Sequence, residues 1–206
     1  MLKTILIADE HTILDLPIKS GYVLDVGCQQ FTFSKHMKSL GYKCYALEPD
    51  NDVREPDGIH LIRGALVQKN YPYDTQLLVK WSTGEGNHLI HIPGERPPDA
   101  VEQPVKVYTI EQITGMSYCD SWDVIKLDCE GAEYEVLKQW PGPIARQITV
   151  EFHDHTGANP GGLKTYDEIF CHLSQWYAIV KHNLESKYAS GAANYCDSLF
   201  VLRSEL

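Results

Sequence analysis

The sequence predicts an α/β fold with a mainly parallel sheet, and two observations support this. Short apolar runs rich in Val, Ile and Tyr alternate with segments of helical period, which is typical of strand–helix–strand units. The chain has 206 residues, enough for one core but too few for a catalytic domain plus an independent substrate domain. We therefore expect residues 1–206 to form a single domain.

The predicted strands follow in order along the chain. Short apolar runs predict strands at 22–26, 43–47, 59–62, 124–127 and 147–152, and the run 124–127 is expected to be buried. Two closing runs, 177–180 and 198–202, are separated by a polar segment that contains glycine. We expect these two runs to pair as an antiparallel hairpin.

Helices are predicted between the strands, where apolar residues recur at helical spacing. These residues are Phe33, Met37 and Leu40; Ala132, Val136, Leu137 and Trp140; and Ile169, Phe170, Leu173 and Trp176. Gly41 and Pro141 are expected to end the first and second helices. Thr165, with Glu168 three residues later, predicts a capping box that opens the third.

Composition restricts the class of ligand and the location. A formal net charge of -10 opposes attraction to nucleic acid and to anionic membranes, so we expect neither as a partner. The N-terminal apolar run ILIA is too short for a signal peptide, and no stretch reaches membrane-spanning length. A cytoplasmic location is therefore expected. The six cysteines include no CxxC pair, so we expect free thiols, most of them buried.

Acidic residues follow most of the predicted strands. In an open α/β sheet the ligand lies at the carboxyl ends of the strands, so the residues there are the candidates for chemistry. Those residues are Asp25, Gly27, Glu48, Gly64, Ala65, Asp128 and the segment 151–154. Because acids occupy most of these positions, the site is expected to favour a cationic ligand.

The loop after the first strand argues against a dinucleotide. A nicotinamide oxidoreductase would be expected to carry GxGxxG, whereas this loop has only Gly27, and Asp25 would repel a pyrophosphate. S-adenosylmethionine carries an ammonium and a sulfonium, which an acid attracts. Glu48, at the end of the next strand, is placed to accept hydrogen bonds from two ribose hydroxyls. We therefore expect S-adenosylmethionine as the cofactor.

These motifs resemble those of the FkbM-type methyltransferases, a class I family that depends on S-adenosylmethionine. The matching segments are VLDVGCQQFTFS, YALEPD, GALV, VKVYTIEQI, WDVIKLDCEGAEYEVLKQW, ITVEFHDH and SLFVL. The resemblance implies a Rossmann-like class I methyltransferase fold, with a seven-stranded, mainly parallel sheet, an antiparallel C-terminal strand and helices on both faces. It also implies O-methylation of a hydroxyl on a sugar, glycan or small metabolite.

The resemblance also assigns the cofactor site residue by residue. Next to the methionyl part it places Asp25, Gly27, Cys28 and Gln29; next to the ribose Glu48 and Pro49; next to the adenine Gly64, Ala65 and Leu66; and at the reaction centre Asp128. Phe31 departs from the family, which commonly has a second loop glycine there. This departure favours an alternative function, a non-catalytic S-adenosylmethionine-binding module or partner subunit.

The segment EFHDH supplies the remaining candidates for chemistry. His153 is the first choice for a general base because its unperturbed pKa is near neutral, and Asp128 is the second. Glu151 lies on the same strand face as His153. A divalent metal is a less favoured alternative, and its ligands would be Asp128, Glu151 and His153. Glu130 and Glu133 are also explained by the start of a helix, where acids are stabilised.

The region 66–122 has a different pattern and is predicted to be a β-rich insert. Its short β-like pieces are separated by the turn-rich segments STGEGN and PGERPPDAVEQP. We expect the Pro-rich segment to be a mobile loop and the insert to form the acceptor region. Tyr71, Tyr73 and Trp81 are candidates to line it, although Trp81 is better explained as core. The segment TGANPGG, 156–162, is expected to control access.

Overall fold

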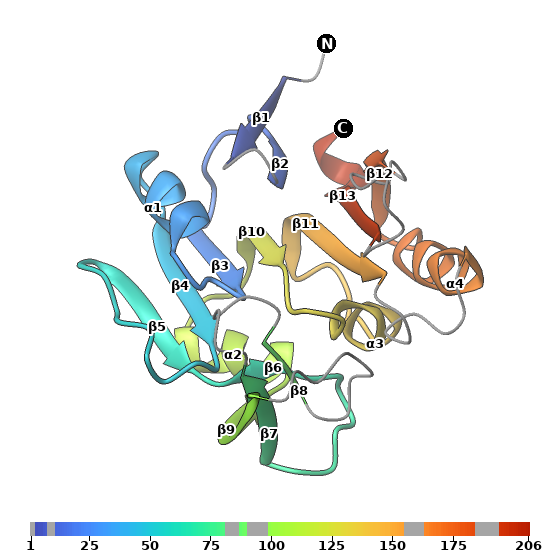
Figure 1. The fold of residues 1–206 in the computed structure, drawn as a ribbon. Coiled ribbons are helices and arrows are strands. Elements are labelled where there is room, and N and C mark those ends of the chain that lie inside the picture. Colours follow the sequence, from blue (N-terminus) through green and yellow to red (C-terminus); the bar gives the residue numbers. More distant parts are fainter. Residues whose placement is uncertain (1–2, 8–10, 81–86, 90–98, 155–162, 184–193) are drawn as a thin grey trace.

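A computed structural model describes residues 3–7, 11–80, 87–89, 99–154, 163–183 and 194–206 (Figure 1). Seven strands form its main sheet, in the order β12-β13-β11-β10-β3-β4-β5. Their bounds are β3 Tyr22–Val26, β4 Lys43–Glu48, β5 Ile59–Arg63, β10 Trp122–Leu127, β11 Ala145–Asp154, β12 Tyr177–Asn183 and β13 Asn194–Leu202. The pairs from β5 to β11 are parallel, whereas β13 is antiparallel to both of its neighbours. The predicted α/β fold is confirmed, with a mixed sheet.

Helices pack on both faces of this sheet. They are α1 Thr32–Ser39, α2 Ile110–Ser117, α3 Glu133–Lys138 and α4 Leu163–Leu173. Side chains alternate along each strand, so Val23 and Val124 share a buried cluster with α1. Leu24 and Ile125 point the other way, into a larger cluster with side chains of α2, α3 and α4. Within the part of the chain that the structure describes, one helix therefore covers one face of the sheet and three cover the other.

An N-terminal hairpin that the sequence did not predict covers part of the α1 face. Its strands, β1 Thr4–Ile7 and β2 His11–Leu14, are antiparallel. The Gln147 side chain on β11 holds β2 by accepting from the Leu14 N–H at 2.6 Å and donating to its carbonyl at 3.1 Å. This contact brings His11, which is 1% exposed, to the carboxyl end of the sheet.

The insert forms a smaller sheet beside β4, at the bottom of Figure 1. Its strands are β6 Ala65–Leu66, β7 Thr75–Lys80, β8 His88–Leu89 and β9 Val101–Tyr108, in the order β6-β9-β7-β8. Lys80 ties it to the loop after β4 through ion pairs with Asp50, at 2.7 Å, and with Asp52. The insert therefore packs next to the strand end that carries Glu48.

Parts of the predicted loops have a different structure. Residues 101–104, expected in the Pro-rich loop, belong to β9, where they pair with β7. Residues 93–98 of this loop lie outside the described residues, as do Trp81 and the segment 156–162. Residues 99 and 100 are described and directly precede β9. Tyr71 and Tyr73 pack edge to face, with ring centroids 5.9 Å apart.

The predicted capping box at Thr165 is wrong. Helix α4 begins at Leu163, so Thr165 lies inside its first turn. A capping box is present at α2 instead, where Thr109 accepts from the Gln112 N–H and the Gln112 side chain accepts from the Thr109 N–H. The two motifs look alike in sequence, and the extended backbone of Thr109 distinguishes them.

Two further predictions concern the cysteines and the membrane. All six cysteines are free thiols, and four are buried, which confirms the prediction. Among the described residues, no helix has the length and apolar character needed to cross a bilayer.

Candidate active site

The glycine loop after β3 is built around a close backbone contact. Gly27 has a φ of 73°, and a Cβ atom at this position would lie 1.6 Å from the carbonyl oxygen of Asp128. The Gly27 N–H donates to the Leu47 carbonyl at 3.0 Å. Only glycine fits this conformation and this contact. The loop therefore brings bare backbone to the ends of β3, β4 and β10.

Asp25 lies beneath this loop rather than at its surface. Its carboxylate is fully buried, accepts from the N–H and the hydroxyl of Ser34 at 3.1 and 2.6 Å, and lies 3.2 Å from Lys126 Nζ. Lys126 also donates to the Gly27 carbonyl at 2.8 Å. We expected Asp25 to face a cationic ligand, but the structure directs its charge to a lysine of the neighbouring strand. Asp25 thereby supports the loop.

Glu48 ends β4 with its carboxylate fixed by backbone donors. Oε2 accepts from the Gln29 N–H at 3.0 Å, and Oε1 accepts from the Asp50 N–H at 2.9 Å. Burial raises the pKa of this carboxyl, while both backbone hydrogen bonds act in the opposite direction. Each carboxylate oxygen has a second lone pair for a further donor, so Glu48 is preset to accept two hydroxyl groups.

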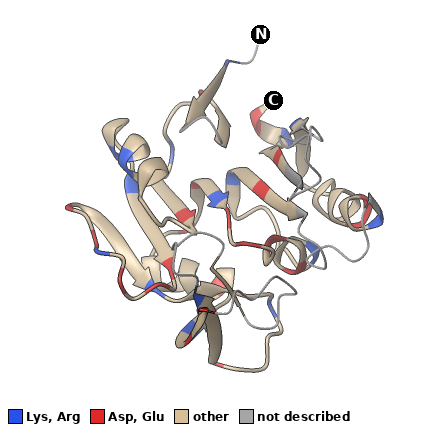
Figure 2. Cartoon of the chain, viewed as in Figure 1, with Lys and Arg blue, Asp and Glu red and all other residues tan. Residues whose placement is uncertain are grey.

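A cavity opens at the carboxyl ends of β3, β4 and β10. The space inside it and in its open mouth amounts to about 740 Å³. Apolar side chains, among them Leu66, Leu78 and Leu89, line one part, and three carboxylate residues line another. These acids are Glu48, Asp128 and Glu130. Figure 2 shows acidic residues along the segment that joins β10 to α3.

Most of the predicted cofactor residues lie around this cavity. The lining includes Gly27, Gln29, Glu48, Pro49, Gly64, Ala65, Leu66 and Asp128. Asp25 and Cys28 are not part of the lining. Cys28 is 4% exposed, and burial raises the pKa of its thiol. Eight of the ten residues predicted to contact the cofactor therefore lie around one cavity. Their part in binding stays a prediction.

The loop after β10 is held by Glu133, whose side chain is fully buried. Its carboxylate accepts from the N–H groups of Cys129, at 2.6 Å, and Gly131, at 2.9 Å. The same carboxylate lies 3.0 Å from Nδ1 of His153. Glu130 has a φ of 52°, a left-handed conformation that this anchoring maintains. Glu133 is therefore a structural anchor for the loop, a role beyond the helix start considered from the sequence.

His153 and Asp128 form a compact network of charges. His153 Nε2 lies 3.5 Å from Asp128 and 3.6 Å from Glu130. Burial opposes protonation of His153, but Glu133, Glu130 and Asp128 outweigh it and raise its pKa to about 10. The ring is therefore protonated near neutral pH, so the argument that chose it as a general base from its unperturbed pKa does not hold here.

Asp128 occupies the centre of this network. Its carboxylate lies 3.0 Å from Lys126 Nζ and 3.9 Å from His11 Nε2. Burial opposes ionisation, but Lys126, His11 and His153 together outweigh it and hold the pKa of Asp128 well below its usual range. Asp128 is thus an anion at neutral pH and forms part of the cavity wall.

The sequence missed two residues near Asp128. Lys126 lies among the apolar residues of β10, and a buried lysine requires a carboxylate partner. Its position in the sequence could therefore have indicated an ion pair with a nearby acid. His11 lies on the unpredicted hairpin, and no local pattern marked it. Of the predicted catalytic residues, His153 and Glu151 do not line the cavity and come from β11, next to Asp128.

Phe31 adopts the left-handed conformation typical of the glycine that it replaces, with φ 57° and ψ 24°. Its side chain is 4% exposed and packs in the cluster of Val23, Phe33 and Met37. It does not line the cavity. The Phe31 ring therefore does not narrow the cavity.

The sequence matches the family model described as the methyltransferase FkbM domain, over residues 25–176. The match covers 176 − 25 + 1 = 152 of the 206 residues. The chain belongs to the FkbM methyltransferase family. The resemblance read from the motifs is thereby confirmed, and the matched range contains β4, β10, β11 and the last two residues of β3.

Several solved structures resemble this FkbM-family chain at low identity. The PH0226 protein from Pyrococcus horikoshii OT3 has 9% identity and a TM-score of 0.41, covering 90% of this chain and 83% of that one. A TehB-like SAM-dependent methyltransferase from Corynebacterium glutamicum has 10% identity and a TM-score of 0.45, covering 91% and 83%. A putative hemolysin from Streptococcus thermophilus has 10% identity and a TM-score of 0.47, covering 91% and 61%. No curated protein matched the sequence. The family assignment depends on the family model alone.

Proposed function

We propose that the protein transfers a methyl group from S-adenosylmethionine to a hydroxyl group of a sugar, glycan or small metabolite. The observation that carries this proposal is the position of Glu48, whose fixed carboxylate forms part of the cavity wall at the end of β4. The FkbM family supplies the class of reaction.

The cavity residues fit each part of S-adenosylmethionine. Glu48 has acceptor capacity for two ribose hydroxyls, and Leu66, Leu78 and Leu89 offer an apolar surface for the adenine. Gly27 brings main-chain atoms to the cavity wall, beside which the methionyl part is proposed to lie. We infer that the ribose lies at the end of β4 and the methionyl part near the end of β10.

The charge of the cavity favours this ligand over a dinucleotide. Glu48, Asp128 and Glu130 all line it, so a pyrophosphate would be repelled and a cation attracted. From the sequence we expected Asp25 to attract the cation. Asp25 pairs with Lys126 instead, and the three acids of the cavity wall supply the attraction. When bound, S-adenosylmethionine supplies an electrophilic methyl group on a sulfonium.

Residues around Asp128 are proposed to position the acceptor hydroxyl. Asp128 is an anion in the cavity wall, and Glu151 lies close to it on β11. We assign to the Asp128 carboxylate a hydrogen bond that it accepts from the hydroxyl, which orients the hydroxyl oxygen toward the methyl group. His153, held as a cation by Glu133, is a positioning residue that orients Asp128 and Glu130. Alignment of the two reacting groups supplies much of the acceleration in such transfers.

The alternative of a non-catalytic binding module had one supporting observation, the replacement of a loop glycine by Phe31. Since the Phe31 ring packs in the core and does not line the cavity, it no longer favours that alternative.

The experiment is methyl transfer from S-adenosylmethionine labelled in its methyl group to a panel of sugars, glycans and phenolic metabolites. We expect labelled product from at least one hydroxyl acceptor. Asp128→Asn should lower turnover by about 100-fold or more, since a group near the reaction centre is lost. Glu168→Gln, an exposed change on α4, is the matched control and should retain the parent rate. Binding of S-adenosylmethionine without transfer to any acceptor would contradict the proposal.

A further inference from the structure

His11 is a buried histidine without a hydrogen-bond partner. It is 1% exposed, and neither ring nitrogen has such a partner among the described residues. An unsatisfied buried polar group costs free energy, so its place in the fold requires an explanation. The ring is fixed in part by an edge-to-face contact with Phe33, with centroids 5.7 Å apart. Nothing in that contact uses its nitrogens.

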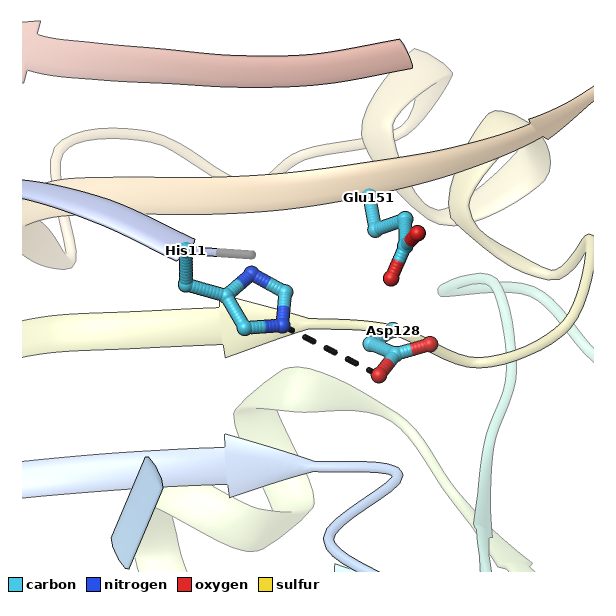
Figure 3. A group of neighbouring side chains, drawn as sticks. All are labelled: His11, Asp128 and Glu151. Carbon is cyan, nitrogen blue, oxygen red and sulfur yellow. Dashed lines mark ion pairs between the residues drawn. The ribbon is translucent and has the colours of Figure 1, made fainter. Parts of the chain in front are cut away.

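The ring of His11 points toward two carboxylates (Figure 3). His11 comes from β2, Asp128 follows β10, and Glu151 comes from β11, so three separate elements converge. One nitrogen or oxygen atom from each of the three residues lies within 4.8 Å of the other two. This convergence places one imidazole and two carboxylates around a common point.

The distances suit ligands of one ion better than a hydrogen bond. His11 Nε2 lies 3.9 Å from Asp128 Oδ2, which is too far for a hydrogen bond. With metal–ligand bonds of about 2.1 Å, two ligands of the same ion lie about 3 to 4.2 Å apart. Small side-chain rotations would bring the widest pair of this group into that range.

The local charge also favours a cation. Five carboxylate residues lie in this region: Asp25, Asp128, Glu130, Glu133 and Glu151. The nearby side-chain cations are Lys126 and protonated His153. A divalent ion would reduce this excess of negative charge. Lys126 does not block the site, because a carboxylate oxygen that meets it has a second lone pair.

We propose that His11, Asp128 and Glu151 bind a divalent transition-metal ion, with Mn²⁺ and Zn²⁺ as the best fits to one imidazole and two carboxylates. The metal set considered from the sequence contained His153 in place of His11. The new assignment makes the N-terminal hairpin part of the site. Binding of the metal ion by these three residues does not depend on the proposed function. The part that the ion would play there, polarising an acceptor hydroxyl next to Asp128, does rest on that function.

A second group of potential ligands must be distinguished from the first. Asp128, Glu130 and His153 also offer atoms within 4.8 Å of one another. Asp128 belongs to both groups, so its substitution does not separate them. His11 and Glu151 belong only to the first, and Glu130 only to the second. The His11 ring nitrogens have no hydrogen-bond partner among the described residues, whereas His153 Nδ1 already contacts Glu133 at 3.0 Å. This difference favours the first group.

The test is a calorimetric titration of the full chain, stripped with a chelator, with MnCl₂ and separately with ZnCl₂. No S-adenosylmethionine is present, so failure of this inference is separate from failure of the proposed function. We expect one equivalent of at least one metal to bind. His11→Phe, which keeps the ring contact with Phe33, and Glu151→Gln should each weaken binding at least about tenfold.

Two control variants make the result decisive. His60→Ala removes an exposed histidine on β5 that stacks on Tyr45, and it should bind metal like the parent. Glu130→Gln should also bind within a few-fold of the parent. The inference is overturned if the parent binds neither metal, or if Glu151→Gln binds like the parent. It is equally overturned if Glu130→Gln abolishes binding while His11→Phe does not.

Discussion

The Nζ atom of Lys126 lies 3.2 Å from Oδ1 of Asp25, and both side chains are buried between adjacent strands. The two residues are direct partners in the parallel pairing of β10 with β3. The same ammonium donates to the Gly27 carbonyl and lies 3.0 Å from Asp128. One cation thus links the glycine loop, the buried acid and the reaction-centre candidate.

We predict that Lys126→Met lowers the free energy of unfolding by about 3 to 5 kcal/mol, because it leaves Asp25 buried without its cation. Urea denaturation measures this change. The matched control is Lys138→Met, which removes a partly exposed ion pair with Glu135 and should cost less than about 1 kcal/mol.

A double variant tests the pairing itself. Lys126→Met combined with Asp25→Asn should cost less than the sum of the two single changes, because no uncompensated charge remains at Asp25. Additive costs would show that Lys126 and Asp25 do not interact in the folded protein.

Phe31→Gly should destabilise the protein by about 1 to 4 kcal/mol. Removal of a buried phenylalanine costs about 3 to 5 kcal/mol, and relief of the left-handed backbone returns about 1 to 2 kcal/mol. Tyr118 is a matched control, since it has a φ of 53° but is 93% exposed. Tyr118→Gly should therefore stabilise the protein, by about 1 kcal/mol.

The same variant separates packing from ligand binding. Because the Phe31 ring does not line the cavity, Phe31→Gly should bind S-adenosylmethionine within a few-fold of the parent at a temperature where it is folded. A large loss of affinity in a folded Phe31→Gly protein would assign Phe31 to the site.

The contribution of Glu205 to stability should disappear in acid. Hydrogen bonds from Arg146, and then Lys19, lower its pKa to about 2, compared with about 4.3 in an unfolded chain. A lowered pKa stabilises the folded state above the unfolded value, and that stabilisation is lost as the pH falls toward 2. The unfolding free energies of the parent and Glu205→Gln should therefore approach each other progressively as the pH falls from 5 to 2. A constant difference across this range would contradict the assignment.

Local patterns predicted the strands well, because a strand buried on both faces appears in the sequence as a continuous apolar run. Strand β10 is buried at every position, and four apolar residues mark it in the sequence, although it also contains Asp123 and Lys126. The same patterns placed Glu48 at a strand end and at the cavity, because that position depends only on where the strand stops.

Side-chain partners were harder to predict, because they depend on contacts between distant segments. Asp25 was assigned to a ligand although it pairs with Lys126, about a hundred residues later in the chain. His11 reaches Asp128 only because Gln147 fixes the N-terminal hairpin against β11. Neither contact leaves a local sequence pattern.

Calorimetric titration with S-adenosylmethionine, of the parent and of Glu48→Gln, tests the central claim most directly. The claim is that the cavity at the ends of β3, β4 and β10 binds this cofactor, with Glu48 on the ribose. We predict saturable binding to the parent, none of NAD, and a loss of about tenfold or more in Glu48→Gln, since charged hydrogen bonds are weakened. Asp52→Asn, an exposed change nearby, should bind like the parent. Binding of NAD alone, or equal affinity of Glu48→Gln and the parent, would contradict the account.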